Sequence, residues 1–131
     1  IPKMQVFNSG FRSRYCPFTF DEARTNPAEW GRFTESAVGA HLAGRAVMDD
    51  FELFYWRNDR REECDYVLRK GQSLVAIEVK SGHADSTVGF EKFKKLYAPE
   101  ITSAFIVGPQ NLPLEDFFSL DLKQLFKREG K

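Results

Sequence analysis

The residues in this chain best suited to chemistry are Asp65, Glu78 and Lys80, which lie in a stretch rich in β-branched and aromatic side chains. The stretch is interrupted at Gly71-Gln72, and glycine can adopt the positive φ that the first position of a type II′ two-residue turn requires. If the turn lies there, the flanking segments form a β-hairpin that places Asp65 directly opposite Glu78, with Cβ atoms about 5 Å apart. The sequence therefore predicts two carboxylates that face each other.

Facing carboxylates repel each other, so a proton, a cationic side chain or a metal ion must compensate their charge. Because side chains alternate along a strand, Lys80 is expected on the same face as Glu78, while Ile77 and Val79 point the other way into a core. A hard cation such as Mg²⁺ binds one or two carboxylates together with water and phosphate oxygens, and Asp65 with Glu78 supplies such a pair. The three polar side chains therefore fit a metal site in which the lysine orients or deprotonates an attacking water.

An ordinary solvated surface is the alternative explanation of the Glu-x-Lys pattern, which is common on the exposed face of an amphipathic strand. Two observations favour a site. Asp65 stands at the matching position of the other strand. Leu74 and Ala76 should share the face of Glu78, so that this face is not uniformly polar. A pocket rim explains that mixture better than open surface does.

The composition is that of one packed domain without a strong net charge. The chain has 131 residues, 42% of them hydrophobic and thirteen of them Phe, which is enough for one core and too little for two domains. Its net charge is zero, so any binding to nucleic acid would have to be local. No apolar run reaches the roughly 20 residues that span a bilayer and no basic-then-apolar leader precedes the domain, so we expect a cytoplasmic protein with no membrane partner. The first residue is Ile rather than Met, which suggests a piece excised from something longer.

A helix is best marked after Asn26. Asn26 can cap it, Pro27 suits the first helical position, and Glu29 can reach back to the cap. The helix should continue to about Leu42 with a broad apolar arc on one side. Glu35 lies at the edge of that arc, and a carboxylate there needs a partner, which is either an arginine or the site on the hairpin.

The remaining elements follow from strand, cap and turn signals. We expect strands at residues 51–57 and 104–107, the second of them buried on both faces, and a helix capped by Thr87. Weaker patterns predict a strand at residues 4–7, a loop over residues 11–25 and a short peripheral helix at residues 121–126. The resulting order is a helix, three antiparallel strands, a helix and a strand.

Cysteine and histidine add no site of their own. Cys16 and Cys64 lack a paired metal-ligand spacing, and we interpret both as reduced and structural. His41 falls within the apolar arc of the helix, where a packed side chain is the expected role. His83 lies in a glycine-containing loop after the hairpin and is left out of the site.

With an acid on the first helix, Asp on the second strand and Glu-x-Lys on the third, the chain resembles the PD-(D/E)XK nuclease superfamily. It is most similar to the C-terminal domain attached to a P-loop ATPase module in many prokaryotic ATP-binding proteins. The resemblance covers roughly residues 4–108, and its segments are WGR at 30–32 with Glu35, GAHL at 39–42, YWR at 55–57, ECDYV at 63–67 and IEVKSG at 77–82. The chain has no G-x-x-x-x-G-K-[ST] stretch, so the ATPase module itself is not within it.

The resemblance implies a restriction-endonuclease-like α/β fold, an αβββαβ core with a mixed central sheet flanked by helices. It implies a single nuclease-like domain over residues 1–131, excised from a longer ATPase. The core of that domain would be residues 26–108, with an N-terminal extension at residues 1–25 and a C-terminal extension at residues 109–131.

The family's catalytic positions correspond here to Glu35, Asp65, Glu78 and Lys80. A Mg²⁺ or Mn²⁺ ion would be bound by Asp65, Glu78 and the Val79 carbonyl, and Cys64 stands where the family name has proline, a position that carries no chemistry. The implied function is a metal-dependent phosphodiesterase or endonuclease that acts on DNA, with the ATPase module of the same longer protein as its partner. The alternative is a catalytically inactive domain of this fold that serves the ATPase as a regulatory, binding or assembly module.

Overall fold

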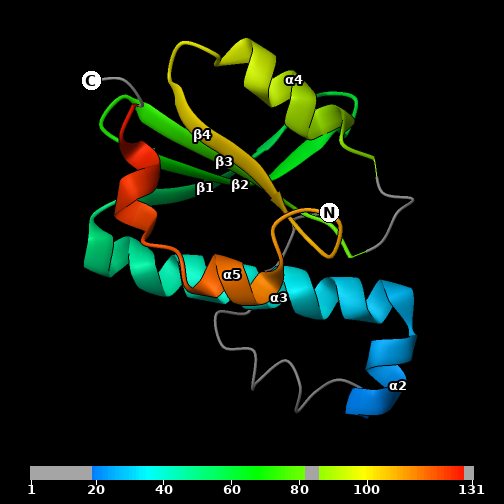
Figure 1. Cartoon of the computed structure of the whole chain (residues 1–131). Coiled ribbons are helices and arrows are strands. Elements are labelled where there is room, and N and C mark those ends of the chain that lie inside the picture. The colour runs from blue at the N-terminus through cyan, green and yellow to red at the C-terminus, as the bar shows by residue number, and fades with distance from the viewer. Residues whose placement is uncertain (1–18, 82–85, 129–131) are drawn as a thin grey trace.

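The computed structural model describes residues 19–81 and 86–128 (Figure 1). Its elements, in chain order, are α2 (Phe20–Thr25), α3 (Pro27–Asp49), β1 (Glu52–Arg57), β2 (Glu63–Lys70), β3 (Ser73–Val79), α4 (Val88–Leu96), β4 (Ile101–Val107), α5 (Leu114–Phe118) and the 3-10 helix η1 (Leu122–Phe126). The strand expected at residues 4–7, Cys16 and His83 lie outside the described residues. The run from α3 to β4 confirms the expected αβββαβ order.

The four strands form one mixed sheet in the order β1-β2-β3-β4. β1, β2 and β3 pair antiparallel, and β4 returns through α4 to pair parallel to β3. α3 and α5 cover one face of the sheet, and α4 covers the other (Figure 1). The fold is therefore the mixed sheet flanked by helices that the sequence predicts. No helix within the described residues is both long and apolar enough to cross a membrane.

The β2–β3 hairpin has the predicted register. Its pairing runs from Tyr66 opposite Ile77 to Lys70 opposite Ser73. Gly71 has a φ of 62°, which fits the first position of a type II′ turn. One step beyond the last regular pair, the same register brings Asp65 opposite Glu78.

A β-bulge lies in β2 next to these acids. The β1–β2 register shifts between Phe54 and Trp56, because β2 carries one extra residue there. As a result Cys64 packs under α4, whereas Tyr66 packs toward α3. Bulges re-aim side chains and recur next to functional sites, and this one contains Asp65.

Two apolar layers hold the sheet between the helices. The α3 layer contains Ile77 of β3 with Val79 packed against it, and the α4 layer contains Ala76 with Leu74 packed against it. This alternation confirms the predicted faces of β3. Glu78 therefore belongs to the α4 face of the strand.

The long helix and its neighbours differ from the sequence expectation. The Asn26 cap is as predicted, since its side chain accepts from the Glu29 N–H at 3.1 Å. α3 then continues to Asp49 rather than ending near residue 42, because the helix tolerates Gly44 and the first left-handed residue is Asp50. α2 occupies part of the loop expected over residues 11–25, and α5 was not expected. Helices of five or six residues carry too little periodicity to be recognised.

The C-terminal third also differs. β4 begins at Ile101 rather than at residue 104, and it is a half-buried edge strand rather than one buried on both faces. The short helix expected at residues 121–126 is η1, and it is not peripheral, because Leu122 is buried in the core. Both differences concern burial, which depends on neighbours that a local pattern does not contain.

Gly89, in the first turn of α4, lies against the backbone of Glu63 on β2. A Cβ at Gly89 would come within 2.2 Å of the Glu63 carbonyl oxygen, which is closer than these atoms can approach. We therefore predict that Gly89→Ala displaces α4 and lowers the free energy of unfolding by about 1 to 3 kcal/mol in urea denaturation. Gly44→Ala is the matched control, because a Cβ there meets nothing within 4 Å. It should raise stability by about 0.5 to 1 kcal/mol. A Gly89→Ala protein as stable as the wild type would show that α4 does not need this close approach.

Candidate active site

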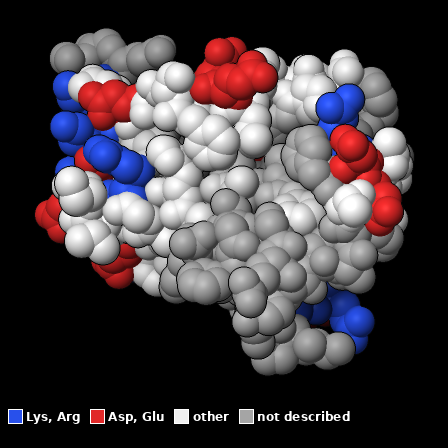
Figure 2. Space-filling view, turned by 90° about the horizontal axis from the view of Figure 1, so that it is seen from below, with Lys and Arg blue, Asp and Glu red and all other residues white. Residues whose placement is uncertain are grey.

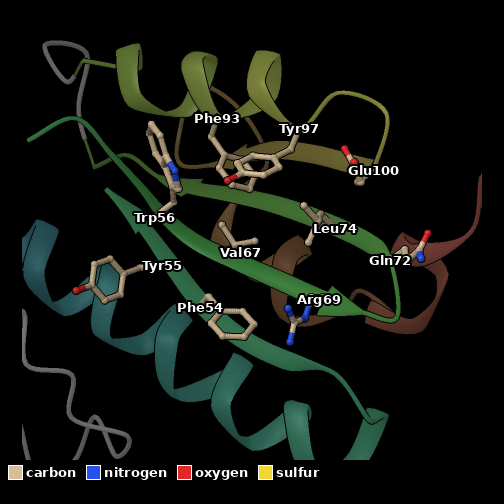
Figure 3. A pocket seen from close by; sticks show the side chains of 10 residues that line it. All are labelled: Phe54, Tyr55, Trp56, Val67, Arg69, Gln72, Leu74, Phe93, Tyr97 and Glu100. Atoms are coloured by element: carbon tan, nitrogen blue, oxygen red, sulfur yellow. The ribbon is translucent and has the colours of Figure 1, made fainter. Parts of the chain in front are cut away.

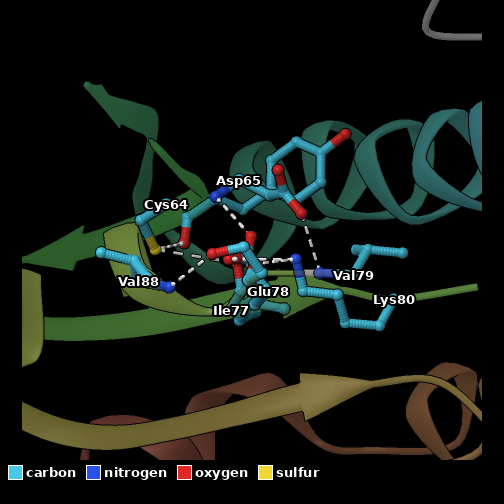
Figure 4. A network of polar contacts seen from close by, with 9 residues as sticks. Cys64, Asp65, Ile77, Glu78, Val79, Lys80 and Val88 are labelled. Carbon is cyan, nitrogen blue, oxygen red and sulfur yellow. Dashed lines mark hydrogen bonds and ion pairs between the residues drawn. The ribbon is translucent and has the colours of Figure 1, made fainter. Parts of the chain in front are cut away.

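Asp65 and Glu78 are joined across the hairpin by two hydrogen bonds, each from a backbone N–H to a carboxylate of the opposite strand (Figure 4). Asp65 Oδ2 accepts from the Val79 N–H at 2.8 Å, and Glu78 Oε1 accepts from the Asp65 N–H at 3.2 Å. The carboxylates thus continue the β2–β3 ladder beyond its last regular pair. Two further oxygens, Oδ1 of Asp65 and Oε2 of Glu78, take no part in these two bonds.

Lys80 adds a cation at the end of β3. Its Nζ lies 3.7 Å from Glu78 Oε2 and donates to the Ser86 carbonyl, just before α4, at 2.5 Å. The Lys80 N–H donates to the Val107 carbonyl at 2.8 Å, and a Cβ on Gly108 would lie 2.3 Å from the Lys80 carbonyl oxygen. The structure therefore brings together the aspartate, the glutamate and the lysine that the sequence singles out.

Burial determines the charge state of this cluster. Glu78 is 3% exposed, and the Lys80 side chain is 16% exposed. Burial, followed by a hydrogen bond to Asp65 and by the negative charge of Asp65, raises the pKa of Glu78 to about 9, and Lys80 offsets only part of this effect. The raised pKa favours the protonated form of Glu78 at neutral pH.

Glu35 is linked to the hairpin through Tyr66, whose hydroxyl donates to the Glu35 carbonyl at 2.8 Å. Burial raises the pKa of Tyr66, and the charges of Glu35 and Asp65 raise it further, so both carboxylates lie within electrostatic reach of this phenol. One turn before Glu35, a Cβ on Gly31 would lie 2.9 Å from Ser81 Oγ. This side of α3 therefore borders the site, and a catalytic role for Glu35 stays a prediction. No local sequence pattern marks Tyr66 as part of the site, because its contact with Glu35 depends on how α3 docks on the sheet.

The pair of carboxylates fits a hard cation that takes most of its ligands from elsewhere. Over residues 19–81 and 86–128, no three His, Cys, Asp or Glu side chains are grouped closely enough to hold a metal ion. Mg²⁺, however, needs only one or two carboxylates when water and phosphate oxygens complete its coordination. Asp65 and Glu78 supply two, and the raised pKa of Glu78 fits as well, because a cation between two carboxylates replaces the proton that Glu78 otherwise holds. The Val79 carbonyl remains the predicted third ligand.

Cys64 and His41 are structural residues near the site. Cys64 is fully buried, and its burial followed by the charges of Glu78 and Asp65 raises the pKa of the thiol to about 12, so it stays neutral and is no nucleophile. His41 packs edge-on against Phe117 and Phe118, with ring centroids 5.5 and 5.1 Å away. Burial and the nearby Arg45 lower the pKa of His41. The packing role predicted for this histidine is thus confirmed.

The fold and the site define an α/β protein with a mixed sheet and a largely buried Asp–Glu–Lys cluster at one end of a hairpin. Residues 30–124 match the family model described as Domain of unknown function (DUF4143), and because this match covers most of the chain, the chain belongs to that family. No curated protein and no solved structure gives a significant match. The description of this family names no activity.

The raised pKa of Glu78 makes stability depend on pH. Between the ordinary value of 4.5 and about 9, the folded state holds a proton that the unfolded chain has lost, so the free energy of unfolding should fall as pH rises through this range. This group contributes a slope of at most about 1.4 kcal/mol per pH unit. Glu78→Gln cannot ionise and should flatten the profile, whereas Glu91→Gln, at an exposed position of α4, should leave it unchanged.

Urea denaturation over this pH range, with metal chelated, measures the effect. Parallel profiles for the wild type and Glu78→Gln would contradict the proposed proton on Glu78.

Proposed function

We propose that this domain is a Mg²⁺-dependent phosphodiesterase of the nuclease type that acts on DNA, and that it forms the C-terminal part of a prokaryotic ATPase. The observation that carries the proposal is a buried glutamate, Glu78, that faces the half-buried Asp65 and has the Nζ of Lys80 3.7 Å away. Apolar residues of similar size would often be as stable in such an environment, so buried ionisable groups with strongly shifted pKa values are candidates for function. The motif segments that resemble PD-(D/E)XK nucleases support the same chemistry.

Asp65, Glu78 and the Val79 carbonyl are the groups that would hold the ion. Bound there, Mg²⁺ would supply an activated water and would stabilise negative charge on the scissile phosphate. The ammonium of Lys80 has three protons, and the bond to the Ser86 carbonyl uses one of them. The others are available to orient the attacking water or to contact the phosphate. The low exposure of the cluster strengthens each of these contacts, because bulk water screens them less.

DNA fits as the substrate because its phosphates would supply oxygens to the metal ion and negative charge to Lys80. The face seen in Figure 2 has Lys and Arg near its margins, interspersed with Asp and Glu, and its described part has no continuous basic stripe. The net charge of the chain is zero. Affinity for DNA should therefore rest on a few local contacts and fall steeply with salt.

The ATPase context is part of the same proposal. DUF4143 domains are commonly attached to ATPases, and the resemblance found in the sequence is to a domain of that kind. A catalytically inactive module that regulates or assembles the ATPase is the competing function. In that case the Asp–Glu–Lys cluster would serve only as a buried charge network, and metal-dependent cleavage is the property that separates the two.

Metal binding to this site should release a proton. A cation that enters between Asp65 and Glu78 displaces the proton on Glu78, so metal affinity should rise with pH up to about 9. Calorimetry with Mg²⁺ and with Mn²⁺, in two buffers of different ionisation enthalpy, measures both the affinity and the released proton. Asp65→Asn should abolish uptake, whereas Asp116→Asn, at an exposed position of α5, should bind like the wild type. Equal uptake by the wild type and Asp65→Asn would remove the metal from this hairpin.

The purified domain should nick supercoiled plasmid when Mg²⁺ or Mn²⁺ is present and stop when a chelator is added. Lys80→Ala should slow nicking by about 100-fold or more, because the water or phosphate loses its cationic partner. Lys95→Ala removes an exposed lysine of α4 and should nick at the wild-type rate. Nicking that survives Lys80→Ala would indicate a contaminating nuclease. A wild-type domain that binds metal and never cleaves would favour the inactive module.

A further inference from the structure

The two edges of the sheet are treated differently by the rest of the chain. At the β4 edge, Val107 forms an isolated bridge with Leu112, and the Leu112 N–H donates to the Ile106 carbonyl, so the following loop pairs with that strand. β1 forms the opposite edge, and among the described residues its only strand partner is β2. An uncovered edge strand presents unpaired backbone groups that can pair with another strand.

A cavity lies on each face of the sheet beside β1. On the α4 face, a cavity of about 600 Å³ is lined by aromatic side chains that include Trp56, Phe93 and Tyr97 (Figure 3). On the α3 face, a cavity of about 660 Å³ is lined by small and apolar residues that include Gly44 and Leu53. Phe54 and Tyr55 line both cavities. A strand added beside β1 would therefore find space for its side chains on both faces.

The middle of β1 lacks the features that protect an edge strand. Its four central residues, Leu53-Phe54-Tyr55-Trp56, include no charged residue and no proline. Phe54 is 42% exposed and Tyr55 is 57% exposed. Charged residues lie only toward the two ends of β1 and in the segments that flank it. Residues 49–52 contain three acids and no base, of which Asp49 is buried and paired with Arg45, so that Asp50 and Glu52 are the exposed ones. Residues 57–61 contain three arginines and one aspartate.

From this charge pattern we infer that β1 pairs antiparallel with β1 of a second copy of this chain, joining the two sheets into one. Antiparallel pairing sets the acidic start of each strand beside the basic end of the other, whereas parallel pairing would set like charges together. The charged residues on β2, Arg69 beside Glu52 and Glu63 beside Arg57, belong to the next strand in from the edge, and the Arg69 guanidinium reaches over the Phe54 ring, 5.0 Å from its centroid. The strand is thus complementary to itself in one orientation, and a two-fold symmetric interface requires that property.

The alternation of side chains restricts the register of this pair. Residues opposite each other in a continuous sheet point to the same face. In a two-fold symmetric antiparallel pair of β1 strands, one residue must therefore face its own copy across the two-fold axis. Centring on Phe54 would place Leu53 opposite the partner's Tyr55. Centring on Tyr55 would place Phe54 opposite the partner's Trp56. Both registers pair aromatic and aliphatic side chains that are now half-buried or exposed.

Sedimentation equilibrium over a wide concentration range tests the pairing. The wild type should dimerise reversibly, and Tyr55→Lys should raise the dissociation constant by about 100-fold or more, because it buries a charge in the interface. Leu96→Lys is the matched control, since Leu96 is 63% exposed on α4 and lines neither cavity. A chain that stays monomeric throughout, or a dimer that both lysine variants weaken equally, would overturn the inference.

Cross-linking gives a second measurement that does not depend on how Tyr55→Lys folds. In a Cys16→Ser background, either Phe54→Cys or Tyr55→Cys should form an intermolecular disulfide, since the residue on the axis faces its own copy at a distance that a disulfide spans. Whichever of these two variants lies off the axis should not form the disulfide, and neither should Leu96→Cys. A dimer that cross-links at neither position in β1 uses another surface, and this result would also overturn the inference. Neither measurement involves metal or DNA, so both are independent of the proposed phosphodiesterase.

Discussion

The architecture at one end of this molecule depends on two carboxylates that face each other, the buried Glu78 and the half-buried Asp65. Asp65 and Glu78 each accept a backbone N–H from the opposite strand, which satisfies one oxygen of each and holds the two carboxylates close together. The raised pKa of Glu78, which favours its neutral form, and the ammonium of Lys80 reduce the repulsion between them. The hairpin register cannot slip without cost, because a shift of one residue would move Glu78 to the opposite face of the sheet.

Three glycines allow neighbouring segments to approach this cluster closely. Gly89 allows α4 to approach β2, Gly108 allows the end of β4 to approach the Lys80 carbonyl, and Gly31 leaves room for Ser81 beside α3. A side chain at either of the first two positions would collide with main-chain atoms, which cannot move aside cheaply. Close approach from three directions keeps Glu78 and Lys80 largely out of water. Low exposure in turn makes each electrostatic interaction in the cluster stronger than it would be on the surface.

The same sheet carries the acidic cluster and the edge strand β1, and Trp56 of β1 lies close to both. Its ring packs on Phe93 of α4 with centroids 5.7 Å apart, and its backbone pairs with Cys64, the neighbour of Asp65. The β-bulge that re-aims the residues around Asp65 lies at this same crossing of β1 and β2. An aromatic contact and a bulge therefore support the site from the β1 side, and among the described residues no strand pairs with the outer edge of β1.

The sequence by itself determined the hairpin, its register and the facing acids, because a two-residue turn and the alternation of side chains are local properties of the chain. The order of the core elements could be predicted for the same reason. The extension of α3 to Asp49 and the position of β4 at an edge could not be predicted from the sequence, since helix ends and burial depend on neighbouring elements. Only the tertiary structure decided that Tyr66 connects the hairpin to Glu35, that Glu78 is buried deeply enough to keep a proton, and that Lys80 is held against the segment before α4. These contacts join residues that are far apart in the chain, and their distances are set by how the two helices dock on the sheet.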